Sequence, residues 1–139
     1  MSEKQKKISI SSKIESIDKA VVEAVKFATE IGVGEDALFG IDMAVREVVA
    51  NAVKHGNKLD ENKQVEITFI SSDKGFEVTV RDFGEGFAVE DVPDPTNPEN
   101  LLKANGRGIL FMRSFMDRVE WFNHEEGGML VKMLKERQD

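Results

Sequence analysis

Hydrophobic residues recur every third or fourth position in two long segments of the chain, the spacing of amphipathic helices. The first predicts a helix over about Ser16–Ile31, which Gly32 and Gly34 end. The second predicts a helix over about Glu35–Lys54. The His-Gly-Asn triplet that follows is expected to close this helix, with Gly56 in a left-handed conformation.

Shorter segments alternate between apolar and polar residues and predict five strands. They cover Lys6–Ser11, Gln64–Ser71, Phe76–Asp82, Arg118–Asn123 and Met129–Lys135. Gly-containing turns at 72–75 and 125–128 join two pairs of them as hairpins. A short helix is expected to begin near Gly108 and to run through Phe115. Helices and mostly antiparallel strands in separate groups indicate an α+β fold, a two-layer sandwich.

The stretch Ala88–Asn105 follows neither pattern and contains all three prolines of the chain. A loop of this length in a compact domain is usually functional or mobile, so we expect it to cover a site as a lid. The chain of 139 residues is long enough for one core, and we expect residues 1–139 to form one domain.

Composition narrows the classes of function. The net charge of −7 argues against a nucleic-acid partner, since phosphate neutralisation needs Lys and Arg. The absence of cysteine excludes thiolate metal sites and thiol nucleophiles, and it suits a reducing compartment. Neither a secretory signal nor an apolar run that could span a bilayer is visible, so we expect a cytoplasmic protein without a membrane partner.

Polar residues of the second helix form the first candidate constellation. Glu47 and Asn51 are four residues apart and therefore share one helix face, which Lys54 and His55 extend by roughly a turn. The neighbouring residues are apolar, so a carboxylate and an amide here need partners. An ordinary solvated edge of an amphipathic helix is the structural alternative.

The motif RDFGEGF at the end of the third strand is the second constellation. Asp82 could accept a hydrogen bond from an exocyclic amine such as that of adenine. Gly84 and Gly86 would allow a sharp turn and the close approach of a flat ring. A turn that the Asp side chain closes, with glycines at positive φ, explains the motif equally well.

The third constellation is the sequence NGRGILFMRSF, in which Gly106 and Gly108 lead into a helix. Free backbone amides at a helix start favour phosphate, and Arg107 could add a charge-assisted contact. The structural alternative is a flexible hinge.

The order and spacing of these three motifs resemble the Bergerat-type ATP site of the GHKL ATPases, the family of gyrase and the histidine kinases. The resemblance extends from the second helix to the last strand. The segments EVVANAVKHGN and NGRGILFMRSFMDRVEW look most like the small branch of bacterial anti-sigma factors that are also serine kinases. The resemblance implies the Bergerat fold, with helices on one face of a mixed, mostly antiparallel sheet.

The resemblance also implies roles for the residues of the second helix. Asn51 would hold Mg²⁺ against the phosphates of ATP, an arrangement that suits an ion keeping several waters. Glu47 would be the general base that takes the proton of a serine hydroxyl. Lys54 and His55 would either contact phosphate or simply end the helix.

The other two motifs would complete the nucleotide site in the same way. Asp82 would recognise adenine, and Gly84 and Gly86 would shape its pocket. Residues 106–108 would close on the phosphates below the lid.

The implied function is an ATP-dependent serine-protein kinase and anti-sigma factor. Its substrate would be a small antagonist with the sulfate-transporter-and-anti-sigma-antagonist (STAS) fold, and it would hold a sigma factor or a similar regulator. Two alternatives stay open: a non-catalytic ATP-binding module that regulates a phosphatase or scaffold, and a lone histidine-kinase catalytic domain. The resemblance also raises a homodimer, for which Ile8 and Ile10 would be exposed if the first strand is an edge.

Overall fold

The computed structural model describes residues 4–84 and 108–137. Each predicted helix and strand is present there, with its ends shifted by a few residues. The elements are β1 (Lys4–Ser11), α1 (Ile14–Glu30), α2 (Glu35–Asn51), a one-turn π-helix (Ala52–Gly56), β2 (Gln64–Ser72), β3 (Gly75–Arg81), α4 (Gly108–Phe115), β4 (Arg118–Asn123) and β5 (Met129–Glu136).

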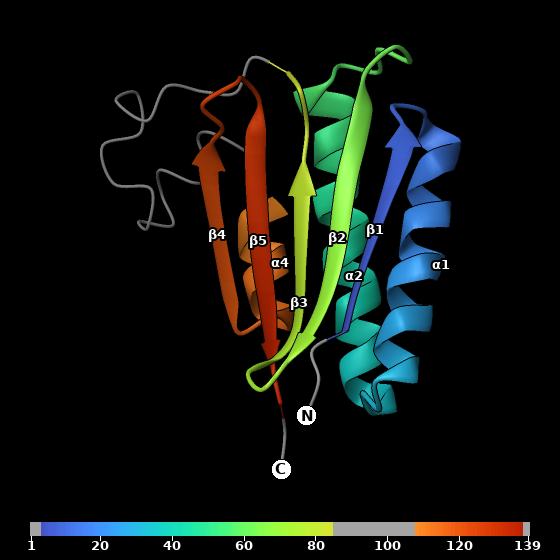
Figure 1. Ribbon diagram of the computed structural model, residues 1–139, viewed down its shortest axis with the longest axis vertical. Coiled ribbons are helices and arrows are strands. Elements are labelled where there is room, and N and C mark those ends of the chain that lie inside the picture. Colours follow the sequence, from blue (N-terminus) through green and yellow to red (C-terminus); the bar gives the residue numbers. More distant parts are fainter. Residues whose placement is uncertain (1–3, 85–107, 138–139) are drawn as a thin grey trace.

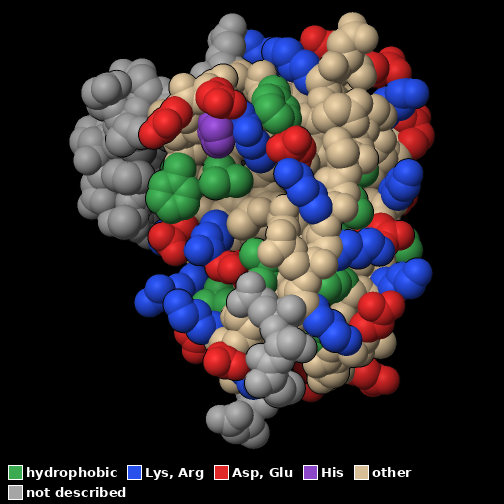
Figure 2. Space-filling model, in the orientation of Figure 1, with side chains coloured by type: hydrophobic (Ala, Val, Ile, Leu, Met, Phe, Trp, Pro, Cys, Tyr) green, Lys and Arg blue, Asp and Glu red, His purple; other side chains and the backbone are tan. Residues whose placement is uncertain are grey.

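The five strands form one sheet in the order β1-β2-β3-β5-β4, and every neighbouring pair is antiparallel. The helices lie together on one face of this sheet (Figure 1). The expected two-layer α+β sandwich is therefore confirmed. The other face of the sheet carries side chains of both charges (Figure 2), and Lys132 and Glu77 form an ion pair of 3.0 Å across it.

The core lies between the sheet and the helices, where the alternation of the strands predicts it. Phe69 of β2 and Phe76 of β3 are almost fully buried, and their ring centroids lie 6.4 Å apart. Phe27 of α1 packs against both rings, at 5.8 and 6.1 Å. This aromatic cluster helps to fix α1 on the sheet, because each large ring buries much apolar area.

The strand β1 is an edge strand, but its apolar side chains are not exposed. Ile10 is only 3% accessible, and Ile8 packs partly against the same core. The expectation that both isoleucines would offer an apolar dimer contact is therefore wrong. Alternate residues of an edge strand still face the helix layer, so the edge exposes backbone groups and not these side chains.

The end of α2 also differs from the expectation. Its last residues form a π-turn in which the Asn57 N–H donates to the Ala52 carbonyl at 2.8 Å. Gly56 is not left-handed; the positive φ angles fall on Lys58 and Leu59. The prediction of a left-handed glycine cap is therefore wrong. Single π-turns within helices are uncommon and often accompany functional sites.

Within the described residues, no helix is long and apolar enough to cross a membrane.

Candidate functional site

Two of the three predicted motifs meet at one end of the sheet, where α2 ends and β3 ends (Figure 1). A Cβ atom on Gly56 would lie 2.2 Å from Oδ2 of Asp82. A Cβ atom on Gly84 would lie 1.8 Å from the carbonyl oxygen of Gly56. Glycine is therefore required at both positions by the close approach of the two segments, and neither residue has a positive φ.

The Asp82 side chain lies in the middle of this junction and is 6% exposed. Its Oδ1 accepts the N–H groups of Gly84 at 3.0 Å and Met129 at 3.1 Å. The structural alternative from the sequence, a turn closed by the Asp82 side chain, is therefore present at Gly84. Gly84 does not have the positive φ that this alternative assumed. Both hydrogen bonds use the same oxygen, so a ligand could still bind at Oδ2.

Burial sets the electrostatics of the same group. Desolvation raises the pKa of the Asp82 carboxyl above its usual range, and the hydrogen bonds from Gly84 and Met129 offset part of that rise. A largely desolvated carboxylate is a strong acceptor for a ligand that brings an N–H donor.

The turn between β4 and β5 closes the junction on another side, which sequence analysis did not recognise. Gly128 has a φ of +85°, and a Cβ atom there would lie 2.1 Å from the Asp82 carbonyl oxygen. The Asp82 N–H donates to the Met129 carbonyl at 3.0 Å. The glycines of this turn were visible in the sequence only as hairpin residues.

Asn57 is a second residue that sequence analysis missed. It is 1% exposed, and its Nδ2 donates to the Ser12 hydroxyl at 2.8 Å and to the Gln64 carbonyl at 3.1 Å. Its Oδ1 accepts the Phe83 N–H at 2.8 Å. The only sequence signal was a polar residue next to Gly56, which is equally typical of an exposed turn.

The helix α2 carries the remaining described candidates to this end of the molecule. Glu47 and Asn51 are half-buried, and Asn51 is the last α-helical residue before the π-turn. Lys54 and His55 lie on the π-turn and are exposed. Glu47 and Asn51 are therefore partly accessible to a ligand on the helix that leads to Asp82.

Several predicted residues lie outside the described part of the chain. These are Gly86, the proposed lid at 88–105, Gly106 and Arg107. Gly108 is described, and it begins α4 as expected.

The side chains available as ligands limit which metal ion could bind at this site. Among residues 4–84 and 108–137, no group of three or more His, Asp or Glu side chains could hold an ion by itself. The Asn51 amide offers one oxygen, which fits Mg²⁺ that takes its other ligands from phosphates and water.

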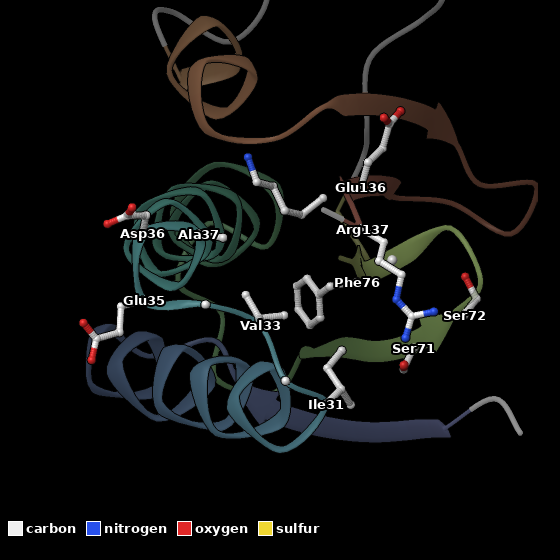
Figure 3. A pocket seen from close by; sticks show the side chains of 14 residues that line it. Ile31, Val33, Glu35, Asp36, Ala37, Ser71, Ser72, Phe76, Glu136 and Arg137 are labelled. Carbon is white, nitrogen blue, oxygen red and sulfur yellow. The ribbon is translucent and has the colours of Figure 1, made fainter. Parts of the chain in front are cut away.

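A cavity of about 550 Å³ lies at the opposite end of the sheet. The α1–α2 connection, the β2–β3 hairpin and the end of β5 line it, with Val33 and Phe76 facing each other inside (Figure 3). None of the residues predicted from the motifs lines this cavity.

Comparison with known proteins shows the family to which the chain belongs. Residues 10–135 match the family model described as the histidine kinase-like ATPase domain. An anti-sigma F factor from Heyndrickxia coagulans is 34% identical over 121 residues, which are 84% of this chain and 81% of that protein. The serine-protein kinase RsbW of Bacillus subtilis is 32% identical over 114 residues, 78% of this chain and 70% of that protein.

Similarity to solved structures shows the fold, as one example illustrates. That structure contains the RsbU and RsbW domains of Rv1364c from Mycobacterium tuberculosis and superposes with a TM-score of 0.67 at 15% identity. The match covers 98% of this chain but only 33% of that longer chain.

Proposed function

The chain belongs to the histidine kinase-like ATPase family, and from this premise we propose that it is an ATP-dependent serine-protein kinase and anti-sigma factor. The names of its relatives support both parts of the proposal, since one is called an anti-sigma F factor and another a serine-protein kinase. ATP with Mg²⁺ would be the phosphoryl donor. A small antagonist protein, of the STAS type by family analogy, would be the substrate.

The observation that carries the proposal is the contact between Gly56 and Asp82. It joins the end of the helix that carries Glu47 and Asn51 to the carboxylate expected to recognise adenine. An ATP-type ligand needs these two functions at opposite ends of one site, because its base and its phosphates are recognised by different groups. The sequence separates Asn51 and Asp82 by thirty-one positions, and the fold brings their segments together.

In this proposal Asp82 binds the base. Its Oδ2 would accept the exocyclic amine of adenine, while Oδ1 stays bonded to Gly84 and Met129. Guanine carries a carbonyl oxygen at the corresponding position, and a carboxylate repels it. Asp82 therefore selects adenine over guanine.

The phosphate end depends on α2. Asn51 would contribute its amide oxygen to Mg²⁺, which neutralises the charge of the phosphates. Glu47, one helical turn before Asn51, would take the proton of the substrate serine as its oxygen attacks the γ-phosphorus. The new P–O bond replaces the bond to the β-phosphate oxygen, so that phosphoserine and ADP are the products.

Phosphorylation then changes the partner. A phosphoserine adds about −1.5 to −2 charges at neutral pH. The kinase is itself acidic, with a net charge of −7, so the modified antagonist is repelled and released. While the antagonist is phosphorylated, the kinase would bind a sigma factor or a similar regulator.

A phosphotransfer experiment tests the proposal. The protein is incubated with Mg-ATP and its candidate antagonist, and the antagonist is weighed by mass spectrometry. One added phosphate on a serine or threonine is expected. Tight ATP binding without any transfer to a cognate antagonist would instead establish the non-catalytic module, and modification of a histidine would establish a histidine-kinase catalytic domain.

A further inference from the structure

The buried amide of Asn57 joins three otherwise separate parts of the chain. Its Nδ2 reaches Ser12 after β1 and the Gln64 carbonyl at the start of β2. Its Oδ1 accepts the N–H of Phe83, the residue directly after Asp82. Ser12 is fully buried as well and donates to the Lys63 carbonyl at 2.6 Å, so the network is anchored in the framework of the fold.

The position of this network matters because Asp82 has little freedom of its own. The Gly56 α-carbon limits the space around Oδ2, and Gly84 packs directly on the Gly56 carbonyl. These are van der Waals contacts, so they set how close the two segments can come but attract them to each other only weakly. The bond from Phe83 to Asn57 supplies the attraction, since Asn57 directly follows Gly56 in the chain.

We propose that Asn57 is a positioning residue for base selection: by binding the Phe83 N–H, it holds the Asp82 carboxylate against Gly56 at the position required to accept the adenine amine. The inference rests on the proposed adenine-binding role of Asp82 and adds the residue that fixes its geometry. Asn57 would not touch the nucleotide. Without its acceptor oxygen, the Phe83 N–H has to find another partner, and the Asp82–Gly84 segment moves away from α2.

The test measures selectivity between bases, which a purely structural role would leave unchanged. Dissociation constants of ADP and GDP are determined by isothermal titration for the wild-type protein and for Asn57→Ala. We expect the preference for ADP over GDP to fall by about tenfold, the order of one lost hydrogen bond.

Ser12→Ala is the matched control. It removes a hydroxyl from the same buried network but leaves the bond between Asn57 and Phe83 in place. We expect it to lower the melting temperature while the preference for ADP changes less than about twofold, since the hydrogen bond next to Asp82 is kept. Equal losses of preference in Ser12→Ala and Asn57→Ala would show that Asn57 only stabilises the fold, and would overturn the inference.

Gly56→Ala provides a test that does not depend on the folding of Asn57→Ala. Its φ is not positive, so alanine fits the backbone, but the new Cβ displaces the Asp82 carboxylate. We expect the same loss of preference for ADP here, and an unchanged preference would contradict the proposed geometry.

Failure of the proposed function is recognised separately: wild type would then bind no ADP, or Asp82→Asn would keep the preference. If Asp82→Asn abolishes the preference and Asn57→Ala keeps it, only the positioning role is refuted.

Discussion

Replacing Asp82 by Asn is expected to weaken nucleotide binding and to stabilise the ligand-free protein at the same time. The amide has the same shape as the carboxylate, and its oxygen can still accept the N–H groups of Gly84 and Met129. The other atom changes from the acceptor Oδ2 to an NH₂ donor. This donor would face the donor amine of adenine, so the hydrogen bond to the base is lost while the local packing is kept.

The magnitude of the binding effect follows from the kind of bond removed. A hydrogen bond to a charged group contributes about 1.5–3 kcal/mol. Its loss corresponds to a rise of roughly 10- to 150-fold in the dissociation constant of ADP. Isothermal titration at pH 7 measures this change directly. Adenosine is expected to show a similar proportional loss, because the contact involves the base and not the phosphates.

The stability effect has the opposite sign and depends on pH. Burial raises the pKa of Asp82 in the folded state, so the native protein binds this proton more tightly than the unfolded chain does. The free energy of unfolding therefore falls as the pH rises from the unfolded-state pKa, about 3.9, through the folded-state pKa. Above that window the carboxylate is a constant destabilising charge, which the neutral amide of Asp82→Asn removes.

Thermal unfolding without nucleotide tests this reasoning. Asp82→Asn should melt above wild type at pH 7, and the difference should shrink as the pH falls through the folded-state pKa of Asp82 and be lost below about 4. A variant that melts below wild type at neutral pH would show that the carboxylate is stabilised by partners and not penalised by burial. Unchanged ADP affinity would remove Asp82 from the base site altogether.

Three further substitutions test the other parts of the site. Glu47→Gln is expected to lower the rate of phosphate transfer to the antagonist by at least about a hundredfold, because the general base is lost. The affinity for ATP, measured by titration, should stay near that of wild type. Asn51→Ala should lose the part of ATP affinity that depends on Mg²⁺ and leave adenosine affinity unchanged; equal losses for both ligands would refute its metal role. Gly84→Ala should lower the free energy of unfolding by about 3 kcal/mol in urea titrations, since the new methyl group meets the backbone of Gly56. Gly34→Ala, where a Cβ meets nothing within 4 Å, should cost less than about 1 kcal/mol and serves as its control.

Periodicity in the sequence was sufficient to predict the secondary structure and the layers. The alternation of Val65, Ile67 and Phe69 places one face of β2 in the core, and the turn at 72–75 pairs it with β3. These are local signals, since each depends on residues within one element or one hairpin. The expected exposure of Ile8 and Ile10 failed because burial of an edge strand is decided by the helices above it, which are distant in the sequence.

The sequence predicted a set of candidate site residues but not their arrangement in space. The resemblance to the Bergerat site indicated Glu47, Asn51 and Asp82 as residues of one site, and the fold brings the described segments that carry them to one end of the sheet. It did not indicate Asn57, because an asparagine beside a glycine has the same sequence signature whether it is exposed in a turn or buried in a network. The three partners of Asn57 come from positions 12, 64 and 83, and no local pattern connects them.

Gly56 shows why such arrangements escape sequence analysis. A glycine after a helix has two physical explanations: a left-handed backbone that other residues avoid, or a neighbour too close to admit a Cβ atom. The first is local and common, and for that reason it is the natural prediction; the second depends on Asp82, twenty-six positions away. Here the second holds, since Gly56 lacks a positive φ and its α-carbon adjoins the Asp82 carboxylate. The two explanations predict opposite consequences for Gly56→Ala: a strained helix end with base selection intact, or a sound helix end with a displaced carboxylate. The same substitution that tests the role of Asn57 therefore also decides why this helix ends in glycine.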